Sequence, residues 1–321
     1  KANRDETPEA IKIAIPYIES ILKAMHIPIM VNEILEFLQI KPGQIGLDAT
    51  LGYGGHTLEM LKKLDSKGHL YSLDIDSIEL PKTKERLEKL GYGSDILTTK
   101  QLNFSDIDEV VLESGLLNFV LADLGVSSMQ IDNPERGFSY KKNGPLDLRM
   151  NPEIGIPAST RIRRLSQEAL EGMLIENADE PHAEVISKAI VKEIKNGMHI
   201  DTTTKLQNII KNALQFVHPS SRDNEIKKSC QRTFQALRID VNREFESIYN
   251  FLEKLPDVLA KDGRVAILSF HSGEDRLVKK SFKRLLIKYE LYNKTNIYNN
   301  FLFIFFYNDS LCEIFKRNSV R

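Results

Sequence analysis

Residues 45–56, which read IGLDATLGYGGH, decide the fold because they join a short apolar run to a glycine-rich turn and then to a helical pattern. Residues 45–49 have the length and composition of a buried strand, and residues 57–64 have helical spacing. Glycines allow positive φ at such a turn and let the backbone approach a ligand. The helix that follows presents its N-terminus, which attracts a carboxylate or a phosphate. This segment predicts one strand, turn and helix of an open α/β sheet, either around a ligand or as a tight turn without one.

Outward from this segment, short apolar runs alternate with helical patterns. The further strands expected early in the chain are residues 69–73, 96–99 and 118–122. A helix is expected over residues 78–90, and strands that alternate with helices indicate a parallel sheet with crossover connections. Another central strand is predicted over residues 264–270, preceded by a helix over residues 242–259.

Residues 134–232 lack strand signals and carry helical patterns instead. These patterns cover residues 167–175, 182–195 and 204–214, and Thr202 begins a run of hydroxyls at the start of the last. We therefore expect an α/β sheet domain, discontinuous in sequence, with an inserted all-helical domain. The expected division is 26–133 and 233–300 for the sheet domain, 134–232 for the insertion, 1–25 for an N-terminal extension and 301–321 for a C-terminal tail.

The composition is that of an ordinary globular protein, with 321 residues, 41% hydrophobic and 28% charged. The 44 basic residues nearly balance the 45 acidic ones, so a nucleic-acid partner would have to meet a local basic patch. Cys230 and Cys312 give no disulfide framework, and no His, Cys or acid cluster has metal-ligand spacing, so we expect no metal. The longest apolar run, residues 301–306, is far shorter than the roughly 20 residues that cross a bilayer. We expect no membrane segment and a cytoplasmic location, or a mitochondrial or other organellar matrix if a presequence has been removed.

Polar and aromatic residues follow the predicted strands at the edge where open α/β sheets bind ligands. Asp74 ends the second strand and can accept hydrogen bonds from both hydroxyls of a ribose, while capping of the next helix suits Asp76 better. Phe104 follows the third strand and can stack on adenine or pack in the core. The spacing G-x-G-G also differs from the G-x-G-x-x-G of dinucleotide sites. Together these features fit an adenosylmethionine site and disfavour a nicotinamide dehydrogenase.

The stretch 121–150, LADLGVSSMQIDNPERGFSYKKNGPLDLRM, has little apolar periodicity and is suited to contacts with something other than a core. Its blocks DLGVSS (123–128), Gln130, ERGFS (135–139) and GPLD (144–147) resemble the signature of the small-subunit rRNA (cytosine-N4)-methyltransferases, the MraW/RsmH-type family. Three further blocks agree in the same order: HIP (26–28), FQALRI (234–239) with Asn242, and SFHS (269–272) with EDR (274–276). Together the blocks cover roughly residues 26–284.

The resemblance implies a Rossmann-like class I methyltransferase sheet that uses S-adenosyl-L-methionine. It implies that the cofactor is bound by Gly54, Gly55, His56, Asp74, Phe104, Asp123 and Gln130. It also implies small-subunit ribosomal RNA, naked or in the assembled small subunit, as the partner. A homodimer is expected by resemblance alone.

The chemistry is expected at the end of the fourth strand, where Asp123 can accept a hydrogen bond from an amino group as its nitrogen attacks the methyl group. Asp147 and His271 are further catalytic candidates, His271 with a buried structural role as its alternative. The candidate substrate-binding residues are Arg136, Phe138, Arg149, Arg238 and Arg276. For the residues of the turns after Asp123, the alternative is a loop stabilised internally by pairing of Arg136 with a carboxylate. Methylation at a ring carbon would need a nucleophilic cysteine, and neither cysteine follows a strand end.

Some positions depart from the family pattern. Residues 178–180 read ADE where the family has Gly-Glu-Glu, Gly273 replaces a leucine, and the tail FLFIFFYNDSLCEIFKRNSVR replaces the usual basic ending. The leading hypothesis is N4 methylation of a cytosine in small-subunit rRNA. Amino methylation of another RNA or DNA base, or a non-catalytic ribosome-assembly factor that retains the cofactor pocket, are the alternatives.

Overall fold

The computed structural model describes residues 28–292, 302–307 and 310–316, with side-chain surroundings for residues 28–284. The predicted N-terminal extension and the residues His26 and Ile27 lie outside this range. None of the helices in the described ranges has both the length and the apolar character needed to cross a membrane.

A seven-stranded sheet forms the centre of the larger domain, in the order β3-β2-β1-β4-β5-β6-β7. Its strands are β1 (Ile45–Asp48), β2 (His69–Asp74), β3 (Leu97–Gln101), β4 (Leu117–Asp123), β5 (Leu259–Ser269), β6 (Leu302–Tyr307) and β7 (Ser310–Lys316). Neighbouring strands from β3 to β6 run parallel, and β7 runs antiparallel to β6. The expected doubly wound parallel sheet is confirmed, and the strand order reverses direction between β1 and β4.

Helices cover both faces of the sheet. Within β4, Phe119 and Leu121 pack on one face, while Val120 and Ala122 pack on the other. The first face is covered by α2 (Val31–Leu38), α3 (Gly55–Leu64) and α4 (Glu79–Lys89), and the second by α5 (Ile107–Ser114), α12 (Glu244–Val258) and α13 (Ser272–Tyr292). Burial on both faces is the reason that these strands appear in the sequence as continuous apolar runs.

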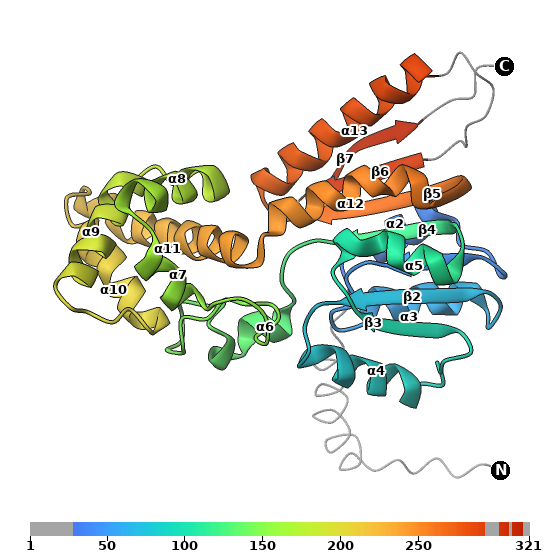
Figure 1. Ribbon diagram of the computed structural model, residues 1–321, viewed down its shortest axis with the longest axis horizontal. Coiled ribbons are helices and arrows are strands. Elements are labelled where there is room, and N and C mark those ends of the chain that lie inside the picture. The colour runs from blue at the N-terminus through green and yellow to red at the C-terminus, as the bar shows by residue number, and fades with distance from the viewer. Residues whose placement is uncertain (1–27, 293–301, 308–309, 317–321) are drawn as a thin grey trace, which may run out of the picture.

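The insertion is a helical domain with a core of its own, and Figure 1 shows it beside the sheet domain. After the short helix α6 (Ser128–Asp132) and a loop, its helices are α7 (Ala158–Arg164), α8 (Gln167–Ala178), α9 (Ala183–Lys195), α10 (Thr203–Ala213) and α11 (Pro219–Asn242). Thr202 caps α10, because its hydroxyl accepts a hydrogen bond from the backbone N–H of Lys205.

Two segments differ from the expected division. Helix α11 runs without a break through residue 232, and Phe234 and Leu237 pack in the core of the insertion. The helix ends only at Arg243, whose φ of 51° turns the chain into α12. The tail, expected outside the sheet domain, contributes β6 and β7 to the sheet. Its apolar run 301–306 has the length of a buried strand.

A buried ion pair joins the loop that enters the insertion to the sheet domain. Arg136 Nη1 lies 2.8 Å from Asp76 Oδ2, and the two side chains are 6% and 0% exposed. Arg136 Nη2 donates to the carbonyls of Arg149 and Met150, and Gln130 Nε2 donates to Asp76 Oδ2 at 2.7 Å. The other oxygen of Asp76 accepts from two backbone N–H groups at the start of α4. The carboxylate of Asp76 thus connects three segments: the start of α4, helix α6 with Gln130, and the loop that carries Arg136.

Replacing Arg136 by methionine is expected to lower the free energy of unfolding by about 3–5 kcal/mol, because the carboxylate of Asp76 would remain buried without its cation. Urea unfolding would measure this loss. Arg276→Met is the matched control, because its ion pair with Asp179 is largely exposed and such pairs contribute about 1 kcal/mol or less. Equal losses in the two variants would contradict the assignment.

Candidate active site

A cavity of about 290 Å³ opens at the carboxyl ends of the central strands. Its lining comes from the segments that follow β1, β2, β3, β4 and β5, and from the start of α12. This is the position where the strand order reverses and where open α/β sheets bind ligands.

The turn between β1 and α3 supplies an uncapped helix N-terminus. Gly54 is the N-cap of α3 with a φ of 80°, and no side chain caps the helix within the described residues. A Cβ at Gly54 would lie 2.9 Å from Thr83 Cγ2, so the position demands glycine for both conformation and space. Gly55 lines the cavity beside it. The free N–H groups of this first turn are suited to bind a carboxylate.

Asp74 ends β2 with its carboxylate turned into the same cavity. Its Oδ2 accepts from the backbone N–H of Gly52, and its Oδ1 accepts from that of Asp76, both at 2.9 Å. Burial raises the pKa of Asp74 to about 6, although these two hydrogen bonds oppose the shift. Each oxygen retains a lone pair for a hydroxyl donor, so the side chain is suited to a ribose.

Phe104 lines the cavity and also contacts the core. Its ring lies edge-to-face against Phe251 of α12, with centroids 5.3 Å apart. Phe104 therefore packs in the core and also lines the cavity, the two roles considered from the sequence. Its remaining surface is available to a flat apolar group such as a purine.

Asp123 and His56 face each other across the middle of the cavity. Asp123 Oδ2 lies 3.6 Å from His56 Nε2, and the backbone N–H of Asp123 donates to Thr50 Oγ1 at 2.7 Å. Asp123 Oδ1 and His56 Nε2 are buried atoms without a hydrogen-bond partner among the residues described. Buried polar atoms normally find partners, so these two atoms are available to a polar group from outside the chain.

Gln130 reaches the cavity with its amide already engaged. Its Oε1 accepts from the backbone N–H of Ser127, which closes a capping box at the start of α6, and its Nε2 donates to Asp76. Gln130 therefore forms part of the cavity wall, with both ends of its amide bonded to the chain.

Comparison with known proteins identifies the family. The sequence model described as the MraW methylase family matches residues 23–298. The chain belongs to the MraW methylase family. It is 73% identical over 260 residues to ribosomal RNA small subunit methyltransferase H 2 of Alkaliphilus metalliredigens, a match that covers 81% of this chain and 74% of the relative. Ribosomal RNA small subunit methyltransferase H 1 of Lachnoclostridium phytofermentans is 70% identical over 261 residues, covering 81% and 71%. The corresponding protein of Fusobacterium nucleatum is 39% identical over 269 residues, covering 83% and 82%.

This methylase is a methyltransferase that uses S-adenosyl-L-methionine. The cavity fits that cofactor in three respects: an uncapped helix start for its carboxylate, a buried carboxylate for its ribose hydroxyls and an aromatic ring for its adenine. The predicted residues Gly55, His56, Asp74, Phe104, Asp123 and Gln130 all line the cavity. Gly54 does not line it and instead holds the turn.

The candidate substrate residues do not gather in this cavity. Arg136 is held by Asp76, which is the internal pairing given above as its alternative. The remaining arginines have carboxylate partners too: Arg149 with Asp147, Arg238 with Glu244 and Arg276 with Asp179. Phe138 packs against the core of the insertion, with the Arg136 guanidinium 5.7 Å from its ring centroid. His271 lies beside the cavity against Glu274 and is 12% exposed.

Glu244, Phe270 and Glu274 also line the cavity, although none of them was among the predicted site residues. Phe270 directly follows β5, lines the cavity and is 43% exposed. A signal was available for it, because a central strand was predicted over residues 264–270 and Phe270 is its last residue. Glu274 lies three residues after His271 at a helix start, a spacing that puts both side chains on one face.

Binding of S-adenosyl-L-methionine is expected to weaken at low pH because of Asp74. Its pKa of about 6 means that the carboxylate takes up a proton as the pH falls through 6, and the protonated group is a poorer acceptor for hydroxyls. At pH 5 about one molecule in eleven would hold the ionised form, so the affinity should be about tenfold lower than at pH 7.5. Calorimetric titration at several pH values would measure this.

The control for that titration is Asp74→Asn, which removes the ionisable group. This variant should bind more weakly at pH 7.5 and should lose most of the pH dependence between 5 and 7.5. The same slope in the variant and the natural protein would assign the dependence to another group.

Proposed function

We propose that the protein transfers the methyl group of S-adenosyl-L-methionine to the exocyclic N4 of a cytosine in small-subunit ribosomal RNA. The observation that carries this proposal is the carboxylate of Asp123, with one buried oxygen unpartnered among the described residues, in a cavity suited to that cofactor. The names of the relatives, ribosomal RNA small subunit methyltransferase H, support the substrate. Asp123 can accept a hydrogen bond from an amino group, which supports N4 as the atom that is methylated.

We assign the cofactor to the first half of the cavity. Gly55 and the N-terminus of α3, held by Gly54, bind its carboxylate, Asp74 binds its ribose, and Phe104 stacks on its adenine. His56 and Asp123 then lie at the reactive end, and Gln130 supports the wall.

Asp123 supports the chemistry by accepting a hydrogen bond. The N4 lone pair of cytosine is delocalised into its ring, so the amino group needs an acceptor while its nitrogen attacks. Bound S-adenosyl-L-methionine supplies an electrophilic methyl group: the bond from N4 to carbon forms, the bond from sulfur to carbon breaks, and S-adenosylhomocysteine leaves. Asp123 accepts the hydrogen bond from the N4 amino group and directs the proton that N4 loses towards His56 and solvent.

Phe270 is the proposed platform for the cytosine ring. It follows β5 at the level of Asp123, because Asp123 pairs with Leu268 in the sheet, and its ring lies close to Gly125. An enzyme that modifies a base holds it out of its stack between apolar surfaces. An exposed phenylalanine at the cavity wall provides such a surface, a role that the sequence had suggested for Phe138.

We assign substrate recognition to the helical insertion, which has a separate core and meets the sheet domain beside the cavity. Two further properties remain proposals. Bacterial relatives favour a cytoplasmic location over an organelle. The choice between naked RNA and the assembled subunit, and a homodimer, are predictions from the resemblance and call for direct measurement.

The proposed reaction is tested by incubating the protein with methyl-labelled S-adenosyl-L-methionine and unmodified small subunits, followed by nucleoside digestion and mass analysis. Labelled N4-methylcytidine is expected. A different labelled nucleoside would retain the cofactor and overturn the target. Cofactor binding without any label would favour the ribosome-assembly alternative.

Two variants separate chemistry from base binding. Asp123→Ala should lower kcat by about 10²- to 10³-fold, the scale of a lost hydrogen-bonding group at a reacting atom. Phe270→Ala should chiefly raise KM for the subunit, because base stacking contributes about 1–3 kcal/mol. Full methyl transfer by Asp123→Ala would refute its role, and an unchanged KM in Phe270→Ala would refute the platform.

A further inference from the structure

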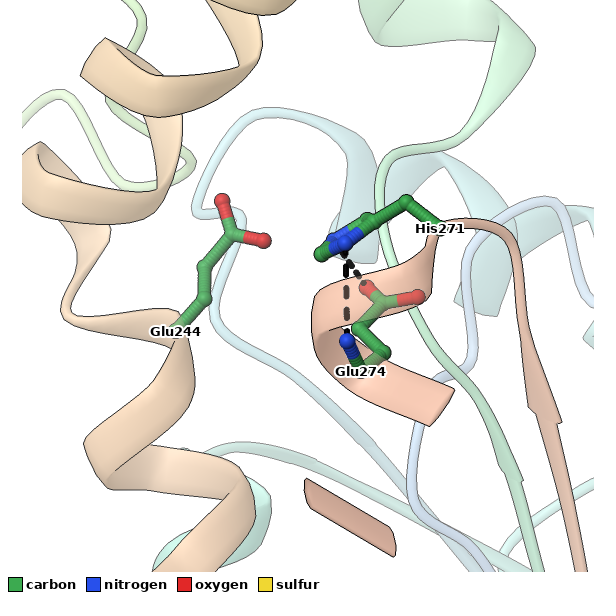
Figure 2. A group of neighbouring side chains, drawn as sticks. All are labelled: Glu244, His271 and Glu274. Atoms are coloured by element: carbon green, nitrogen blue, oxygen red, sulfur yellow. Dashed lines mark hydrogen bonds and ion pairs between the residues drawn. The ribbon is translucent and has the colours of Figure 1, made fainter. Parts of the chain in front are cut away.

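Glu244, His271 and Glu274 converge at the side of the cavity, although the first lies far from the others in sequence. Glu244 comes from the start of α12, His271 from the turn between β5 and α13, and Glu274 from the first turn of α13 (Figure 2). Each offers one donor atom, and these three atoms all lie within 4.8 Å of one another. Figure 2 shows the carboxylate of Glu244 turned towards the imidazole of His271.

Two of these donors are buried without partners. His271 Nε2 and Glu274 Oε1 lie 3.1 Å apart, but they are not aligned for a hydrogen bond and have no other partner among the described residues. The Glu274 side chain is 1% exposed, and its other oxygen accepts from the backbone N–H of Phe270. An unsatisfied carboxylate oxygen is expensive to bury, which points to a ligand between these atoms.

The two carboxylates of the cluster, Glu244 and Glu274, lie near one guanidinium, that of Arg238. Arg238 is buried and forms two hydrogen bonds with Glu244, at 2.8 and 2.9 Å, so these two groups neutralise each other. Glu244 and Glu274 bring two carboxylates to the cluster, so a bound cation would balance the second one.

We propose that Glu244, His271 and Glu274 bind a divalent transition-metal ion such as Zn²⁺ or Mn²⁺. One imidazole nitrogen and two carboxylate oxygens form a donor set that suits these ions, whereas Mg²⁺ prefers oxygen alone. Bonds of about 2.0–2.1 Å in a tetrahedral site place neighbouring donors about 3.3 Å apart. His271 Nε2 and Glu274 Oε1 are already close to that separation, and Glu244 completes the set.

The surroundings give the ion both support and access. Arg238 holds the carboxylate of Glu244 in place, as outer hydrogen-bond partners do for metal ligands. Ligation through Nε2 places the imidazole proton on Nδ1, so His271 gives up only a long contact, 3.4 Å, in which Nδ1 accepts from the backbone N–H of Glu274. Glu244 and Glu274 line the cavity, so the remaining coordination positions face it. The ion joins α12 to the turn that carries Phe270, and thereby fixes the wall of the cavity.

Metal titration of the full, tag-free chain tests this site without RNA or S-adenosyl-L-methionine. The protein is treated with EDTA, freed of chelator and titrated with ZnCl₂ and with MnCl₂ by calorimetry, and bound metal is counted by mass spectrometry after dialysis. One ion per chain is expected from at least one of the two salts. No saturable binding of either salt would overturn the proposal. Because methyl transfer is not measured, this outcome is independent of the proposed reaction.

Two variants locate the ion. His271→Gln should lower the affinity more than about tenfold, the loss that even outer partners of a metal site cause. His182→Gln is the matched control, because His182 also lies near a single glutamate, Glu225, at 3.7 Å, and should bind normally. Retained affinity in His271→Gln, or equal losses in both, would overturn the assignment. If His271→Gln does not fold, X-ray absorption of the zinc-loaded natural chain must show one imidazole with oxygen ligands, and its absence would refute the site.

Discussion

The buried ion pair between Arg136 and Asp76 is the contact on which the arrangement of the two domains depends. Asp76 follows β2, and Arg136 lies in the loop that leaves the sheet for the insertion. A buried carboxylate is stable only when its lone pairs are satisfied, and here Arg136, Gln130 and the start of α4 together satisfy them. The backbone N–H of Asp76 also donates to Asp74, so the group that fixes the insertion adjoins the group assigned to the cofactor ribose.

The same constraint explains the distribution of charge around the cavity. Arginines that resemble substrate contacts in the sequence are neutralised by carboxylates of the chain, whereas Asp74 and Asp123 are carboxylates without a cation of their own within hydrogen-bonding distance in the described part of the chain. Asp74 accepts only backbone N–H groups, and burial raises its pKa to about 6. The cavity therefore presents acceptors to its ligands, which suits donors such as ribose hydroxyls and an amino group.

The sequence predicted the sheet and the turn after β1 well, because both follow from local rules. Strands buried on both faces are continuous apolar runs, and Gly54 is required at its φ of 80°. It did not predict the partners of Arg136 and Arg238, since pairing with Asp76 or Glu244 depends on tertiary contacts. The end of the insertion was misplaced because the pattern of α11 continues through residue 232 and ends only at Arg243. The strands of the tail were not predicted, because one short apolar run, residues 301–306, does not by itself distinguish a buried strand from other apolar segments.

Helix α11 offers a direct physical connection between the insertion and the reactive end of the cavity. Its 24 residues span about 36 Å, with Phe234 and Leu237 in the core of the insertion and Arg238 bound to Glu244 in the cavity wall. Asn242, at the last turn, accepts from the backbone N–H of Met150 and donates to the carbonyl of Leu148, so the loop that carries Arg136 is fastened to the same helix. If the insertion binds the substrate as proposed, a rotation of the insertion would act on Glu244 and on the loop through the same helix. Helix α11 thus links the proposed recognition domain to the wall of the cavity.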